Sequence, residues 1–327
     1  MKIVLFWSSI LDQSYNSHND WRNSTIKLSS FHYLSLLSHI KFNNEVELYT
    51  YQNTDNTNIP SEIILKDAND IFPSEYAYNA LIRGHSIAHI SDAVRLIRAS
   101  EINGVVIDLD AVVLNKFPDN VNNGWFASMP AKATGGFAPK WGNSHPPLTI
   151  HDNSWDGKAL AMFPIKINDI TKKYTQNSAN KILKTLALPP AKESSHAWNY
   201  VMWTLKDIMK VNKNLTVYPP ITFCPISGWL SSGKCYSLES PTRLDGKTEL
   251  FGHTLPSIAT IIQETITVQH FFESAFQKAS QVKSDFWLNV KEGSLVSIEA
   301  EHILGNNWRE ILNNYANKSE ISNIHNI

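Results

Sequence analysis

Cysteine is scarce in this chain of 327 residues. Its two cysteines, Cys224 and Cys235, are too few for a disulfide framework or a cysteine-rich zinc site. They could form a single bridge, but we interpret them as two buried free thiols. The histidines show no His-Glu-x-x-His or similar zinc spacing. The small disulfide-stapled class and the common zinc classes are therefore excluded.

Charge is also low, and neither sign dominates. Charged residues make up 18% of the chain, against about 25% in typical proteins, and the formal net charge is −1. A nucleic-acid binder that relies on a basic surface is excluded, and so is an acidic disordered chain. A hydrophobic fraction of 43%, with 11% aromatic residues, is enough for a sizeable core.

Long hydrophobic runs are missing as well. No stretch reaches the roughly 18 apolar residues that a membrane span needs. The first apolar run, Ile3 to Trp7, is too short for the core of a signal peptide and is typical of a buried strand. We therefore expect no transmembrane segment and a cytoplasmic location.

The order of hydrophobic patterns predicts an α/β protein with a mostly parallel central sheet. A strand–helix–strand opening is followed by a possible third strand, which favours right-handed crossovers. Beyond residue 120 the pattern weakens, and 128–157 reads as a long loop region rich in Gly, Pro, Asn and Trp. We expect strands at 2–6, 45–51, 63–65, 215–218 and 265–270, and helices at 27–40, 86–102, 181–188, 196–211 and 308–315.

The most informative segment is 86–117. A helix over 86–102 is followed by Asn103 and Gly104, which are typical beyond a helix end, and then by a short apolar strand that runs into Asp108-Leu109-Asp110. On a straight strand, side chains two residues apart point the same way, so we expect Asp108 and Asp110 to converge. Two close carboxylates repel unless a proton or a cation lies between them, and oxygen ligands suit Mg²⁺ or Mn²⁺. An acidic strand end without a metal is the alternative.

A second acidic position lies 16 residues earlier. Ser91 and Asp92 are expected to open the helix, and Asp92 and Arg95 are neighbours on one helical face. Taken alone, these residues could be a helix cap and a surface salt bridge.

Together these residues resemble a known family. Ser91-Asp92-x-x-Arg95, a helix, Gly104, an apolar strand and Asp108-x-Asp110 are similar to the core of the DXD-containing sugar transferases. These include capsule and lipopolysaccharide transferases and the large clostridial glucosylating toxins. Later segments resemble the same family more loosely: the Phe223-x-Pro225 segment with Trp229, and Val268-x-His270 before two Phe. At two positions the chain departs from the family, with Asn103 in place of a glycine and Ile107 in place of an aromatic residue.

The resemblance implies a GT-A-type nucleotide-sugar-binding fold in one domain over 1–327. Residues 1–115 would form the nucleotide-binding half, 116–300 a loop-rich, helical acceptor half, and 301–327 a helical tail. The implied activity is metal-dependent transfer of a hexose from a nucleotide sugar, a UDP-hexose, to a carbohydrate acceptor. The similar families retain the anomeric configuration, and the resemblance to capsule and lipopolysaccharide transferases implies a role in bacterial surface polysaccharide synthesis. Association with a membrane-linked acceptor would be peripheral.

The resemblance also assigns roles to residues. Trp7, Ser8, Asp92 and Arg95 would bind the nucleotide sugar together with the acidic pair, with Trp7 stacking on the base and Asp92 holding the ribose. Asp108 and Asp110 would hold Mn²⁺ or Mg²⁺ on the diphosphate.

His270 follows an apolar, β-branched run and precedes two Phe, so we expect it at a strand edge near the core. One interpretation makes it a core histidine. The other makes it a third ligand of the same metal, because neutral imidazole suits Mn²⁺ acceptably.

Two other functions remain open. In a haloacid-dehalogenase-type phosphatase, Asp108 would be the nucleophile and Asp110 the general acid, with Asp152 to Asp156 as a late acidic motif. In a non-catalytic glycan-binding protein, Trp125, Trp141 and Trp155 would stack on sugar rings.

Overall fold

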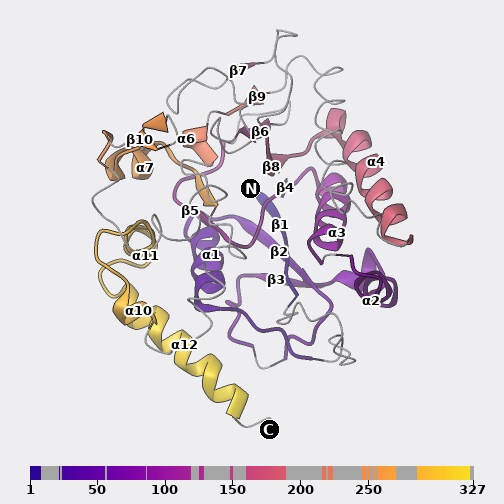
Figure 1. Ribbon diagram of the computed structural model, residues 1–327, viewed down its shortest axis with the longest axis horizontal. Helices are drawn as coiled ribbons and strands as arrows, with labels where there is room; N and C mark the ends of the chain where they lie inside the picture. The colour runs from indigo at the N-terminus through magenta and orange to yellow at the C-terminus, as the bar shows by residue number, and fades with distance from the viewer. Residues whose placement is uncertain are drawn as a thin grey trace.

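The computed structural model describes residues 1–8, 22, 24–55, 57–85, 87–118, 125–128, 148–149, 160–188, 216–218, 220–223, 245–247, 249–250, 253–254, 256–269 and 286–324. A central sheet has helix α1 on one side and helices α2, α3 and α4 on the other (Figure 1). The predicted α/β class is confirmed.

The first part of the chain alternates strands and helices. Its elements are β1 (Lys2–Phe6), α1 (Ser30–Lys41), β2 (Glu45–Thr50), β3 (Ile64–Asp67), a 3₁₀ turn (Ala68–Asp70), α2 (Ser74–Ile82), α3 (Ile87–Ile102), β4 (Val105–Val106) and β5 (Ala111–Val113). Helix α1 begins at a capping box, in which the Ser29 hydroxyl accepts from the His32 amide and His32 Nδ1 accepts from the Ser29 amide. Sequence patterns located β1, α1, β2, β3, α3 and β4, but not the 3₁₀ turn, α2 or β5.

The later part has shorter elements. They are β6 (Trp125–Ser128), β7 (Leu148–Thr149), β8 (Leu160–Lys166), α4 (Asp169–Leu186), β9 (Thr216–Val217), α6 (Pro220–Phe223), β10 (Glu249–Leu250), β11 (His253–Thr254), α7 (Ile258–Glu264), β12 (Thr267–Gln269), α10 (Phe286–Asn289), α11 (Leu295–Leu304) and α12 (Trp308–Ile324). The strands expected near 216 and 267 are confirmed. The helix expected over 181–188 begins earlier, at Asp169, and the helix expected over 196–211 lies outside the described residues.

The central sheet has the strand order β3-β2-β1-β4-β8-β6-β9-β7. Strands β3, β2, β1 and β4 pair in parallel with one another, which confirms the crossover connections expected for this part. Antiparallel pairing begins at β8, which joins β4 to β6. The parallel half of the sheet is therefore the part that the predicted site uses.

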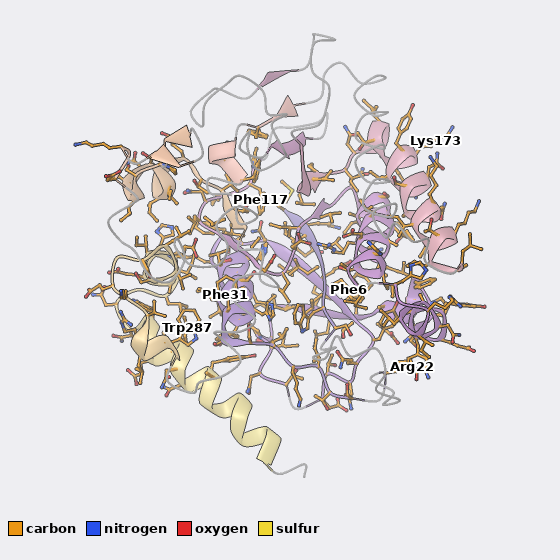
Figure 2. All side chains as sticks on the ribbon, viewed as in Figure 1. Phe6, Arg22, Phe31, Phe117, Lys173 and Trp287 are labelled. Atoms are coloured by element: carbon orange, nitrogen blue, oxygen red, sulfur yellow. The ribbon has the colours of Figure 1, made fainter. Side chains whose placement is uncertain are left out.

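Both faces of β1 are buried, as its uninterrupted apolar sequence predicts. Val4 and Phe6 pack with α2, α3 and α4, whereas Ile3 and Leu5 pack on the face that Leu36 of α1 covers. In Figure 2, Phe6 lies toward α2, while Phe31 and Trp287 lie on the opposite side, near α1 and α10.

The turn between α3 and β4 contains Asn103, one of the two positions at which the chain differs from the family that its sequence resembles. Asn103 takes a left-handed conformation with φ +51°, which Asn tolerates better than most residues with a side chain. A side chain at position 104 would be crowded, because a Cβ there would lie 3.1 Å from the Ile102 side chain and 3.4 Å from the Lys2 carbonyl oxygen. Asn103 is therefore compatible with this turn, and glycine suits the crowded position that follows it.

The C-terminal helices belong to the core on the α1 side of the sheet. Trp308 and Leu312 of α12 are buried in one cluster with Phe31 and Trp287. The Trp287 indole N–H donates to the Ser30 hydroxyl at 2.6 Å. The helix expected near 308–315 is confirmed, and it is longer than that pattern indicates, because α12 continues to Ile324.

Candidate functional site

The strand order places the candidate residues at a crevice of the sheet. From β1 the chain moves outward through β2 and β3, then returns to the other side of β1 with β4, so the direction reverses between β1 and β4. In open α/β sheets, ligands bind outside the carboxyl ends of the two strands at such a point. Trp7 and Ser8 follow β1 directly, and Asp108 lies two residues beyond β4. Since Val4 pairs with Val106, the ends of these two strands are neighbours.

Asp108 and Asp110 lie in a turn, which we call the carboxylate turn (residues 107–111). Strand β4 ends at Val106, and the Ala111 amide donates to the Asp108 carbonyl at 3.2 Å. Both aspartates are partly exposed. The premise that they converge because they sit on a straight strand is therefore wrong. Beyond the turn, β5 pairs antiparallel with β12 rather than continuing in the central sheet.

Arg95 joins helix α3 to the carboxylate turn. Its Nη1 lies 2.6 Å from Oδ1 of Asp108 and donates to the Ile107 carbonyl at 2.6 Å, and its Nη2 lies 2.8 Å from Oδ1 of Asp92. Arg95 is 3% exposed and Asp92 is 2% exposed, whereas the Asp108 side chain is 34% exposed. One buried guanidinium thus fixes the start of the turn and holds a partly exposed carboxylate at its edge.

Two local predictions about this helix are wrong. Helix α3 begins at Ile87, so Ser91 and Asp92 lie in its second turn and do not cap it. The alternative of a surface salt bridge between Asp92 and Arg95 is also wrong, because both side chains are buried. Their i, i+3 spacing predicted the contact correctly.

The burial of this cluster changes its electrostatics. Burial raises the pKa of Asp92 to about 7, the nearby Arg95 cation works in the opposite direction, and the charge of Asp108 adds to the rise. The two carboxylates raise the pKa of Arg95 further above its usual range, although burial opposes them. Arg95 is therefore cationic at every relevant pH.

Trp7 is held by two contacts beside the end of β1. Its indole N–H donates to the Lys27 carbonyl at 2.9 Å, and its ring centroid lies 4.0 Å from that of His32, with the planes 53° apart. Trp7 is half-buried against the core, so both core packing and a ligand contact are compatible with its position. Ser8 is buried, and its hydroxyl lies 3.5 Å from Oε1 of Gln52.

His270 lies outside the described residues, as do Pro225, Trp229, Trp141, Trp155 and the segment from Asp152 to Asp156. The strand that precedes His270 is described, however. Gln269, the last residue of β12, pairs with Ala111, the residue after Asp110.

The donor set of the carboxylate turn suits a hard divalent cation. Asp108 and Asp110 supply carboxylate oxygens at a partly exposed position, as Mg²⁺ and Mn²⁺ require. Among the described residues, no three His, Cys, Asp or Glu side chains gather closely enough to hold a metal ion. If Asp108 and Asp110 hold a cation, they would leave coordination positions for further ligands.

Sequence patterns missed two serines that contact β5. The Ser35 hydroxyl of α1 donates to the Ala111 carbonyl at 2.6 Å, and the Ser38 hydroxyl accepts from the Val113 amide at 2.9 Å. Both serines are buried. Their position on α1 is a weak signal, because serines on exposed helix faces look the same in a sequence.

Comparisons with known proteins found a distant structural neighbour. No family model and no curated protein matches the chain. A solved structure described as "PaToxG Glycosyltransferase" is similar with a TM-score of 0.35 and 14% identity, covering 64% of this chain and 73% of that one. Within the described parts of the chain, every helix is too short or too polar to cross a membrane.

Proposed function

We propose that this protein is a metal-dependent glycosyltransferase that moves a hexose from a nucleotide sugar, a UDP-hexose, to a carbohydrate acceptor. The observation that carries the proposal is the reversal of strand order between β1 and β4, with Trp7 and the carboxylate turn at the ends of these two strands. This is the position where α/β sheets bind nucleotides. An aromatic ring, carboxylates and a buried arginine are all found there.

Each residue has a proposed role. Asp108 and Asp110 would hold Mn²⁺ or Mg²⁺, which would neutralise the departing diphosphate. Trp7 would stack on the base, with Ser8 beside it, and Arg95 would keep Asp108 in place. Asp92 would accept a hydrogen bond from the ribose. This last role is the most demanding sterically, because 2% of Asp92 is exposed.

His270 is proposed as a further ligand of the same metal. The pairing of Gln269 with Ala111 supports this proposal, because it brings the described end of β12 to the carboxylate turn. If His270 is a ligand, His270→Ala should raise the Mn²⁺ requirement and lower turnover more than tenfold, with little change in the melting temperature of the metal-free protein. A fall in that temperature at unchanged Mn²⁺ dependence would instead identify a packing role.

The finer parts of the proposal rest on the sequence resemblance. They are retention of the anomeric configuration, a role in capsule or lipopolysaccharide synthesis, a cytoplasmic location and peripheral contact with a membrane-linked acceptor. Proton NMR of the new linkage tests the first, since a UDP-α-hexose should give an α-linked product. A β-linked product would contradict it.

The decisive experiment is a thermal-shift screen of nucleotide sugars with and without Mn²⁺. A UDP-sugar should raise the melting temperature in the presence of Mn²⁺ and much less without it, because Asp108 and Asp110 would hold the diphosphate through the metal. The hit is then tested for metal-dependent hydrolysis and transfer. If the protein binds no nucleotide sugar but forms an aspartyl-phosphate at Asp108, it would be a phosphatase instead.

A further inference from the structure

The chain that forms the carboxylate turn leaves one sheet and enters another. Some of its backbone groups therefore have no partner within either sheet. Along β5, the carbonyl of Ala111 and the amide of Val113 point to one edge, while Val112 faces β12, where it pairs with Val268. A buried carbonyl or amide without a partner costs about as much as a lost hydrogen bond. The edge of β5 opposite β12 therefore needs donors and acceptors from outside the sheet.

Helix α1 supplies them with two buried serines. Ser35 donates to the Ala111 carbonyl at 2.6 Å, and Ser38 accepts from the Val113 amide at 2.9 Å while donating to the Ser35 carbonyl at 2.6 Å. Both side chains are fully buried, so water does not compete for these groups. A helix surface thus completes the hydrogen bonding of a strand edge.

The carboxylate turn is in this way held at both ends. Arg95 of α3 donates to the Ile107 carbonyl, at the first residue of the turn, and Ser35 of α1 donates to the Ala111 carbonyl, at its last residue. These two helices lie on opposite sides of the sheet (Figure 1). The positions of Asp108 and Asp110 therefore depend on both of them.

Helix α1 also contacts the other half of the candidate site. His32, one turn before Ser35, lies against the Trp7 ring. Its ring is buried, and burial lowers the pKa of His32 to about 3, so it is neutral near pH 7. The same helix thus contacts the proposed base-stacking residue and the proposed metal-binding turn.

We propose that Ser35 is a positioning residue for the carboxylate turn, through which α1 sets the spacing between Trp7 and the carboxylates Asp108 and Asp110. This inference rests on the proposed function, because it makes Ser35 a determinant of diphosphate binding. Ser35 does not touch the substrate; it acts through the Ala111 carbonyl.

The matched variants are Ser35→Ala and Ser100→Ala. Ser100 is an equally buried helical serine, whose hydroxyl donates to the Leu96 carbonyl and contacts Thr175, and it lies on α3 rather than on α1. Both changes remove one buried hydroxyl, so both should cost similar stability. Ser35→Cys, with a weak S–H donor of similar size, provides a milder change should Ser35→Ala fail to fold.

The first measurement is hydrogen–deuterium exchange of metal-free protein in peptides that cover 107–113. Ser35→Ala should speed exchange in these peptides severalfold, Ser35→Cys less, and Ser100→Ala not at all. This readout needs neither metal nor nucleotide. Equal exchange in Ser35→Ala and Ser100→Ala would overturn the positioning role.

The second measurement is binding of UDP with MnCl₂ by calorimetry, and of uridine alone by NMR. Ser35→Ala should weaken UDP–Mn²⁺ binding by roughly 3- to 10-fold, the usual size of one lost hydrogen bond, and leave uridine binding unchanged. Ser100→Ala should change neither. Equal loss for uridine and UDP would overturn the inference. If wild type binds UDP no better with MnCl₂ than without it, the proposed function fails and this inference fails with it, even where the exchange results stand.

Discussion

Nη1 of the buried Arg95 lies 2.6 Å from Oδ1 of Asp108, whose side chain is one-third exposed. The contact therefore crosses from the core to the surface. The guanidinium also binds Asp92 and the Ile107 carbonyl, and these contacts fix its position. The Asp108 carboxylate would therefore lose its contact with Arg95 if it moved away. Asp108 is thus held in place by the protein itself, which would lower the entropic cost of binding the proposed cation.

Neutralising either aspartate of the carboxylate turn should remove the metal-dependent activity. Asp108→Asn and Asp110→Asn should both abolish Mn²⁺-dependent transfer, because each removes a proposed ligand charge. Asp108→Asn should also lower the melting temperature, because it weakens a contact of the buried Arg95. Activity assays and calorimetric melting check both points. An Asp110→Asn protein with wild-type turnover would refute the metal site.

Trp7 provides a test of nucleotide binding. Stacking of a base on an aromatic ring contributes about 1–3 kcal/mol, so Trp7→Ala should weaken UDP binding by roughly 5- to 150-fold. Trp7→Phe is the control, because it keeps a stacking face and loses the hydrogen bond to Lys27. It should retain most of the affinity. Calorimetry that finds equal UDP affinity in Trp7→Ala and wild type would assign Trp7 to core packing.

Removal of Arg95 should show how much the buried carboxylate of Asp92 destabilises the folded protein without its cation. Arg95→Met leaves a buried carboxyl without its cation, and such changes cost about 3–5 kcal/mol. Burial already raises the pKa of Asp92 to about 7, so the cost should be smaller at pH 5, where Asp92 is protonated, than at pH 8. Urea unfolding at both pH values measures it. The double variant Arg95→Met/Asp92→Asn should recover part of the loss at pH 8, and no recovery would contradict the assignment.

His39 predicts sensitivity to acid. It is fully buried beside Phe117, its ring nitrogens find no hydrogen-bond partner among the described residues, and burial lowers its pKa to about 3. The unfolded chain takes up this proton near pH 6.5, so the free energy of unfolding falls as the pH drops from about 6.5 toward 3.

The matching variant is His39→Leu, which removes the titrating group and keeps an apolar side chain of similar size. It should reduce the loss of stability between pH 7.5 and pH 5 by about 2 kcal/mol. Between pH 6.5 and pH 5 the unfolded chain binds this proton and the folded chain does not, and each of these roughly 1.5 pH units contributes about 1.4 kcal/mol. Denaturant unfolding at the two pH values checks this. Parallel pH profiles for variant and wild type would show that His39 does not carry the effect.

Local chemistry was enough to predict much of the fold. The apolar run of β1, the period of α1 and the pattern of α3 each depend on neighbouring residues, so their positions follow from the sequence. The contact between Asp92 and Arg95 follows from helical geometry in the same way. The acidic pair at the carboxyl end of a strand could also be placed at a sheet edge, because parallel strands in an α/β protein share that edge.

The tertiary structure decided which ends meet. Nothing local in the sequence shows that β4 pairs with β1, because residues 3 and 105 are brought together by the packing of the whole sheet. The same packing buries Asp92 and Arg95, which their pattern alone assigned to the surface. It also turns the chain at Asp108, since β5 pairs with β12 rather than continuing β4. Ser35 acquires its role in the same way, as a hydroxyl whose partner lies 76 residues away along the chain.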